Sequence, residues 1–238
     1  MINPLLPPGH LRRHAVNRLL LLLVCVPLSV GSLYFSAHAS AAEGCRADKT
    51  PGLQRSYASG WGIDHRNTRY QPNSSLTAKT AGSLQLKWVY GLAETTPRSY
   101  PLITEDTIFV GDGGRGVVAL DRETGCERWV YEHVGPISSA LLRGDINQRP
   151  VIIFNDRLKG VYAIDAITGE FIWHASVTDE PVPWYSGTPL VTDTTVFVPV
   201  ASLEVVLAAN PLYGCCTTSG GMAAVSYTHL TLPTTPYV

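Results

Sequence analysis

Apolar residues in this chain fall mostly into short runs that end at turn-forming residues. The runs at 107–110 and 151–154 end at Gly-Asp and Asn-Asp pairs, and those at 117–120 and 161–164 are each followed by Asp. Short apolar runs bounded by Gly, Asn and Asp are typical of β-strands joined by tight turns. The pattern therefore predicts an all-β fold, with a further strand near 196–199.

Two of these stretches repeat each other. The motif Ala-x-Asp-x-x-Thr-Gly-x-x-x-Trp ends at Trp129 and again, 44 residues later, at Trp173. A period of about 40–50 residues with short strands is typical of β-propellers. Strand spacing alone also fits a β-sandwich, but the repeat favours a propeller. We expect Asp121 and Asp165 to cap the turns and each Trp to pack against the neighbouring sheet.

A third repeat unit begins near Ser186, and an insertion interrupts it before 220–224, where the Val-Ala-Leu-Asp pattern should be completed. Small residues at 99–101 and 138–140 predict innermost strands, and 84–90 predicts an outer strand that enters the ring first. About three blades are thus expected. Because a ring needs at least about four, we expect a partial propeller that does not close on its own.

The two ends of the chain have a different character. Arg12, Arg13 and Arg18 precede an apolar run, and small residues surround Ala39, which predicts a signal peptide at 1–39. The alternative is an uncleaved anchor, but the apolar stretch reaches only the lower edge of a bilayer span and contains Pro and Gly. We therefore expect a periplasmic or secreted protein with no membrane span after cleavage.

The remaining boundaries follow from the repeat. A mature N-terminal segment is expected at 40–58 and the partial propeller at 59–224. Residues 225–238 resemble a translated library adapter, so they are expected to be a non-native tail and His229 receives no role. On this interpretation the native protein continues beyond Ala224.

Charge argues against one class of partner. The 18 Lys and Arg residues against 19 Asp and Glu give a net charge of −1. Proteins that bind nucleic acid by neutralising phosphates carry a basic surplus, so no nucleic-acid partner is expected. The sequence also shows no Ser-His-Asp arrangement, phosphate loop or zinc-ligand spacing.

The repeat resembles the tryptophan-docking motif of quinoprotein dehydrogenases, eight-bladed propellers that bind pyrroloquinoline quinone (PQQ). The Asn-Thr-Arg-Tyr stretch at 67–70 is similar to the entry segment of that family, and the insertion with Cys215 and Cys216 is similar to its polyvinyl-alcohol-dehydrogenase-like branch. The chain departs from that branch after the Cys pair, where Thr218 and Ser219 replace the aromatic and basic residues expected there.

The resemblance implies candidate site residues. In quinoprotein alcohol dehydrogenases a disulfide between adjacent cysteines covers one face of the quinone, which gives Cys215 and Cys216 a cofactor-binding role. Four cysteines remain after signal cleavage, which allows three pairings. If Cys215 and Cys216 bond to each other, Cys45 and Cys126 form a second bridge or stay apart. The structural alternatives are that each cysteine of the adjacent pair bridges elsewhere, or that their disulfide only stiffens a loop.

Two further residues are weaker candidates. Glu204 lies inside the insertion and would ligate Ca²⁺ or hold a quinone-facing base; the alternative is a solvated glutamate. Arg98 precedes an innermost segment and would face a cofactor carboxylate; the alternative is a solvated loop arginine. The catalytic Asp and the calcium ligands are expected beyond Ala224, so none is nominated.

The resemblance, together with the predicted signal peptide, thus implies the N-terminal part of an exported, PQQ- and Ca²⁺-dependent alcohol dehydrogenase. Its substrate would be a secondary alcohol, including polyvinyl alcohol, and a cytochrome c would accept the electrons. The alternative is a cofactor-free propeller scaffold resembling the outer-membrane assembly lipoprotein. The fragment alone is expected to be inactive, because open blades leave apolar faces and strand edges bare.

Overall fold

The computed structural model describes residues 50–226, apart from 59, 65, 73, 94–97 and 134. The predicted signal peptide, residues 40–49 and residues 227–238 with His229 lie outside the described residues. No helix within the described ranges has the length and apolar character needed to span a bilayer. The regular structure there is almost entirely β-strand, with two short helices, η1 (Ala81–Ser83) and α1 (Glu204–Leu207).

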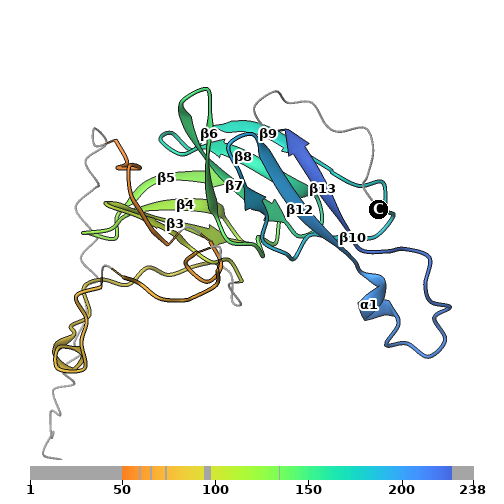
Figure 1. Cartoon of the computed structure of the whole chain (residues 1–238), viewed down its shortest axis with the longest axis horizontal. Helices are drawn as coiled ribbons and strands as arrows, with labels where there is room; N and C mark the ends of the chain where they lie inside the picture. The colour runs from red at the N-terminus through yellow and green to blue at the C-terminus, as the bar shows by residue number, and fades with distance from the viewer. Residues whose placement is uncertain are drawn as a thin grey trace, which may run out of the picture. The chain divides into compact units, whose positions relative to one another are not determined.

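The strands form three antiparallel sheets (Figure 1). The first has the order β1-β2-β3-β4-β5, the second β6-β7-β8-β9, and in the third β10, β11 and β13 all pair with β12. The strands are β1 (Ser56–Ala58), β2 (Leu102–Thr104), β3 (Thr107–Asp112), β4 (Gly116–Asp121), β5 (Glu127–Glu132), β6 (Leu142–Ile146), β7 (Arg149–Asp156), β8 (Gly160–Asp165), β9 (Phe171–Ala175), β10 (Pro183–Trp184), β11 (Leu190–Val191), β12 (Thr195–Ser202) and β13 (Gly221–Ser226).

The middle sheet is covered on both faces, which explains its continuous apolar runs. Val151 and Ile153 of β7 join a buried cluster with Val196 and Val198 of the third sheet. The alternate residue Ile152 joins a cluster with the first sheet. Successive side chains of a strand point to opposite faces, so a strand between two sheets is apolar at every position. Three stacked layers rule out a two-sheet sandwich and confirm the predicted partial propeller of about three blades.

The three sheets share one hairpin register. Asp112 pairs with Gly116 in the first sheet, Asp156 with Gly160 in the second, and Val200 with Gly221 in the third, and each hairpin continues for six residue pairs. The β13 strand therefore occupies the place of β4 and β8, and its last residue, Ser226, stands where the earlier repeats have Asp. Only the third hairpin carries a long connection, residues 201–220.

The tryptophan rings pack on the turn of the next repeat. Gly169 has φ 76°, and a Cβ added there would lie 2.6 Å from Cε3 of Trp129. Gly125 has φ 74°, and a Cβ there would lie 2.7 Å from Cδ2 of Trp88. The Nε1–H of Trp88 also donates to the carbonyl of Arg122 at 3.0 Å. The two glycines can adopt the positive φ and leave room for the indole ring because they lack a side chain.

Two predictions about this repeat need refinement. Residues 84–90 form no strand, yet Trp88 still packs on the turn glycine of the first blade, the place of an outer-strand tryptophan. Trp173 is 7% exposed in the cluster between the second and third sheets. By the repeat, its turn glycine would correspond to position 230, which lies outside the described residues.

The turn aspartates have the structural role predicted for them. Oδ1 of Asp121 accepts the amide and the hydroxyl of Thr124 at 2.9 and 3.0 Å. Oδ1 of Asp165 accepts the amides of Ile167 and Thr168, both at 2.7 Å. These bonds close the same turn in both repeats.

The small-residue segments lie side by side at the inner side of the sheets. The hydroxyl of Ser99 donates to the carbonyl of Ser139 at 3.1 Å, and the amide of Ala140 donates to Oγ1 of Thr188 at 3.1 Å. Tyr100 and Ala140 form a parallel bridge. These segments lead into the inner strands β2 and β6 instead of forming them, which corrects the predicted strand positions by a few residues. The inner edge of β2 is in turn paired with β1.

A buried polar pair joins the first two blades. Nε2 of His133, which follows β5, lies 2.7 Å from Oδ2 of Asp156 at the end of β7, and their side chains are 7% and 0% exposed. Oδ1 of Asp156 accepts the amides of Leu158 and Lys159 at 2.7 and 3.0 Å. A single carboxylate thus closes its own turn and contacts the neighbouring blade.

Candidate functional site

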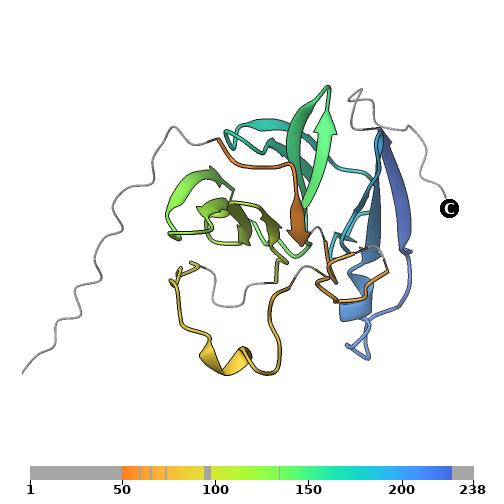
Figure 2. The same cartoon turned by 60° about the vertical axis from the view of Figure 1, so that its left-hand side comes forward.

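The candidate site lies on the long connection between β12 and β13. Figures 1 and 2 show α1 and the loop after it beyond the end of β12. The β10 strand supports the start of this connection, since Trp184 pairs with Ala201 and Pro183 with Ser202. Because the hairpin register is shared, the connection leaves the sheet at the edge where the other two blades have short turns.

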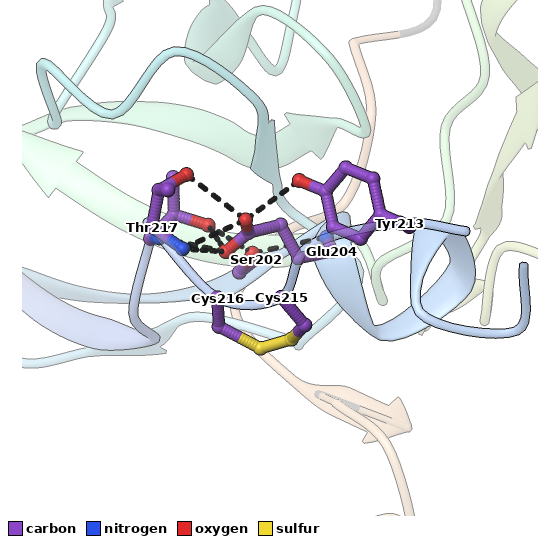
Figure 3. The surroundings of a disulfide bond; sticks show 7 residues. Ser202, Glu204, Tyr213, Cys215, Cys216 and Thr217 are labelled. Carbon is purple, nitrogen blue, oxygen red and sulfur yellow. Dashed lines mark hydrogen bonds between the residues drawn. A yellow bond between two sulfur atoms is a disulfide. The ribbon is translucent and has the colours of Figure 1, made fainter. Parts of the chain in front are cut away.

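Glu204 is the centre of this loop (Figure 3). It is 2% exposed and accepts the hydroxyl of Tyr213 at 2.7 Å. The amides of Thr217 and Thr218 donate to its carboxylate at 2.8 and 2.6 Å, and their hydroxyls at 3.0 and 2.5 Å. The hydroxyl of Ser202 supports the same turn by accepting the Glu204 amide at 3.0 Å.

These bonds fix the charge of Glu204. The hydroxyl of Thr218, the hydroxyl of Tyr213 and the amide of Thr217 all donate to the ionised carboxylate, and they hold its pKa well below the usual range. Hydrogen bonds to a charged acceptor are short and strong. The carboxylate therefore joins the beginning of the insertion to the residues that directly follow the cysteine pair.

Cys215 and Cys216 form the predicted disulfide between adjacent residues. Both are exposed, and Figure 3 shows the disulfide directly before Thr217, one of the residues that donate hydrogen bonds to Glu204. Cys126 is buried at 8% exposure. A bridge between Cys126 and Cys45 stays a prediction, because Cys45 lies outside the described residues.

Arg98 is not part of this cluster. It is exposed, and the next residue, Ser99, lies against Gly111 near the end of β3. That end of β3 corresponds to the end of β12 from which the insertion leaves. Arg98 and the insertion therefore lie at the same edge of their blades, and the role of Arg98 stays a prediction.

The arrangement favours an anchoring role for Glu204 over a metal-binding one. Both carboxylate oxygens face N–H or O–H hydrogens, which would repel a cation. Nor do residues 50–226, within the described positions, bring together three side chains of the type that bind metals. The described residues therefore provide an exposed disulfide on a loop that hydrogen bonds to Glu204 hold in place.

The sequence did not reveal the partners of Glu204. Thr217 and Thr218 are short polar residues without a motif, and Thr218 stands where the resemblance led us to expect larger side chains. One signal was available: Glu204 is the only charged residue between 201 and 220. A single charge in an otherwise uncharged insertion is a candidate for an internal contact.

Known proteins share this fold and sequence pattern. A family model described as outer membrane protein assembly factor BamB matches residues 61–214. A polyvinylalcohol dehydrogenase from Pseudomonas sp. is 29% identical over 170 residues, which cover 70% of this chain and 26% of that protein. Quinohemoprotein alcohol dehydrogenase ADH IIB from Pseudomonas putida is 28% identical over 146 residues, covering 58% of this chain and 21% of the relative.

A solved structure shows the same architecture. Quinohemoprotein alcohol dehydrogenase from Comamonas testosteroni superposes with a TM-score of 0.57 and 21% identity, over 74% of this chain and 26% of that one. The chain spans about a quarter of the length of the relatives it matches.

Proposed function

Because the chain belongs to the PQQ-type propeller family, whose matching model is described as outer membrane protein assembly factor BamB, we propose that it forms part of an exported alcohol dehydrogenase that uses PQQ. The relatives with the longest matches carry the name polyvinylalcohol dehydrogenase. We further propose that its substrates are secondary alcohols, including polyvinyl alcohol, and that a cytochrome c accepts the electrons. Export rests on the predicted signal peptide.

One observation carries this proposal. The disulfide between Cys215 and Cys216 is exposed on an insertion that the first two blades lack, and Glu204 fixes the residues that follow it. A planar cofactor needs a flat, uncharged surface held in one orientation. The disulfide provides such a surface, and no charged side chain shares the exposed part of the loop.

The residues present fit the quinone better than they fit the metal. The disulfide would lie against one face of the ring, and Arg98 would provide a counter-charge for a carboxylate of the cofactor. Bound PQQ would supply the two-electron acceptor for alcohol oxidation, and this part of the chain would orient it and exclude water from one face. Calcium would need oxygen ligands other than Glu204, whose lone pairs already accept hydrogen bonds.

A cofactor-free scaffold remains the second candidate function, favoured by the description of the matching family model. The two functions differ in what the insertion is for. A scaffold would keep its shape and partners without the disulfide, whereas a quinone site would lose affinity.

Quinone binding distinguishes the proposed dehydrogenase from the cofactor-free scaffold. We expect the purified chain to bind PQQ in a fluorescence titration, and the Cys215→Ser, Cys216→Ser double variant to bind at least about tenfold more weakly. Cys126→Ala is the matched control, because it replaces a buried cysteine of the first blade, outside the insertion, and should leave the affinity unchanged. Circular dichroism would confirm that all three proteins are folded. Equal affinity of the double variant, or no binding by the original chain, would overturn the proposal.

A further inference from the structure

One segment of the chain resembles an outer strand but belongs to no sheet. Residues 87–90 read Lys-Trp-Val-Tyr, which nearly repeats the Arg-Trp-Val-Tyr of β5 at 128–131. Trp88 packs on the turn glycine of the first blade in the same way that Trp129 packs on that of the second. Yet residues 84–90, which we call the free outer segment, pair with no strand among the described residues. The segment therefore has the sequence and the ring contact of an outer strand without its hydrogen-bonded partner.

Side chains fix this segment to the first blade. The indole N–H of Trp88 donates to a backbone carbonyl of the first blade at 3.0 Å. The hydroxyl of Tyr90 donates to Oε1 of Glu127 and accepts a hydrogen bond from the guanidinium group of Arg115, both at 2.6 Å. Val89, between the two anchored rings, is 77% exposed. An extended segment held in this way presents its backbone N–H and C=O groups for pairing with another strand.

The third sheet has the complementary gap. Its strand β13 pairs with β12, and within the described residues no strand pairs with its other edge. Val117 of β4 and Val161 of β8 are both 0% exposed, whereas Met222, at the same position of β13, is 54% exposed. The sequence has no tryptophan after Trp184, so no later residue of these 238 supplies a docking ring. As far as the chain is described, the third sheet therefore lacks an outer strand of the type that β5 and β9 provide.

The exposed side chains of this sheet form one continuous face. Phe197 of β12 lies opposite Ala224 of β13, and both line the same open cavity of about 800 Å³ together with Met222. We call these three residues the third-sheet face. The first blade shows what covers such a face, because the equivalent pair of Phe109 and Ala119 is buried against the second blade. The third-sheet face is therefore shaped to receive another blade.

We propose that the third-sheet face and the free edge of β13 bind a second copy of this chain through its free outer segment. In the first two blades the outer-strand tryptophan lies opposite an alanine, as Trp129 lies opposite Ala119. With the same antiparallel register, Trp88 of the second copy would lie opposite Ala224. The first blade of the second copy would then take the place of a fourth blade. This contact involves neither the quinone nor the alcohol, so the inference does not depend on the proposed function.

Two observations favour a second copy over ring closure within one chain. Three blades do not close a ring, which needs at least about four, so the free outer segment does not pair with β13 of its own chain. The first blade also has room for a partner, since Ile108 and Val110 are only half-buried, whereas Ile152 and Phe154, at the same positions of the second blade, are 0% exposed. The third sheet of another copy would cover them. Because the two surfaces differ, the copies would associate head to tail, which leads to rings or filaments.

Sedimentation velocity of the intact chain tests the proposal. We expect the sedimentation coefficient to rise with protein concentration as copies are added. Met222→Asp should weaken this association at least about tenfold, because it places a charge where the other copy would exclude water. Leu158→Asp is the matched control, since Leu158 is 52% exposed in a turn of the second blade and undergoes the same change in polarity. It should associate like the original chain.

A mixing experiment tests the head-to-tail geometry. In the double variant Leu86→Pro, Lys87→Pro the free outer segment loses two successive amides, one of which would point toward β13 of the other copy. At a concentration where the original chain associates, this double variant and Met222→Asp should each be monomeric. Their mixture should form a one-to-one dimer, because each retains the surface that the other lacks. Circular dichroism would confirm that both variants are folded.

Four results would overturn the proposal. The first is an original chain that is monomeric at every concentration, and the second is equal weakening by Met222→Asp and Leu158→Asp. The others are full association of the double variant on its own and a mixture that forms no dimer.

Discussion

The contact between Trp129 and Gly169 can be tested by adding one methyl group. In Gly169→Ala the new Cβ would lie 2.6 Å from Cε3 and 2.9 Å from Cδ2 of Trp129, at a residue with φ 76°. A left-handed conformation costs a non-glycine residue about 1–2 kcal/mol. Forcing a methyl group into a packed contact costs about 1–3 kcal/mol more. We therefore expect the free energy of unfolding to fall by about 2–5 kcal/mol.

A double-mutant cycle separates the two costs. Removing the ring in Trp129→Ala leaves only the backbone cost of Gly169→Ala, so the two changes should be coupled by about 1–3 kcal/mol. Urea unfolding monitored by circular dichroism gives all four values. Trp88 and Gly125 provide the same cycle at the preceding repeat, with a ring that is only half-buried.

The control for these cycles is Gly221→Ala, where nothing lies within 4 Å of the added Cβ. It should change stability by less than about 1 kcal/mol. Additive effects of Trp129→Ala and Gly169→Ala would refute the docking of this ring on this turn. Strong coupling of Gly169→Ala to Trp88→Ala would do the same, because Trp88 belongs to the other turn.

Three further outcomes follow from the polar contacts. Asp156→Ala leaves His133 and two turn amides without their acceptor, so the free energy of unfolding should fall by about 3–5 kcal/mol in urea, whereas Asp145→Ala, at an exposed position, should change it little. Glu204→Gln replaces one acceptor oxygen of the carboxylate by an NH₂ donor. Amide hydrogen exchange at 217 and 218 should therefore accelerate while the amides of the sheets stay protected. Unchanged exchange at these two amides would contradict the anchoring role of Glu204. The pKa of Glu204 is lowered in the folded state. The ionised carboxylate therefore contributes its full stabilisation above the usual glutamate pKa of about 4.3, and this stabilisation is lost only as pH falls through the lowered pKa of the folded state. Amide exchange at 217 and 218, corrected for its intrinsic pH dependence, should therefore stay slow as pH falls through about 4, and early loss of protection would show that the carboxylate is not held as described.

Local repetition made most of the fold predictable. The spacing between Trp129 and Trp173 and the Asp and Gly of each turn are chain-local features, so the strands, the turns and the propeller class follow from the sequence. The inner strands were harder to place. β2 and β6 are defined by their pairing with β3 and β7, whereas the small-residue segments before them form only the isolated bridge between Tyr100 and Ala140 of two different blades.

The site was predictable only in part. Adjacent cysteines and the family resemblance pointed to the disulfide, which the structure contains. The role of Glu204 depended on Tyr213 and on two amides that lie 13 and 14 residues away. Backbone donors carry no sequence signature, so the burial of this carboxylate became visible only in three dimensions.

The most direct test of the central claim is a crystal structure of the chain soaked with PQQ. The account predicts the quinone ring lying flat against the sulfur atoms of Cys215 and Cys216, in van der Waals contact at about 3.5–4 Å. Quinone bound elsewhere on the blades, with the disulfide still facing solvent, would contradict it.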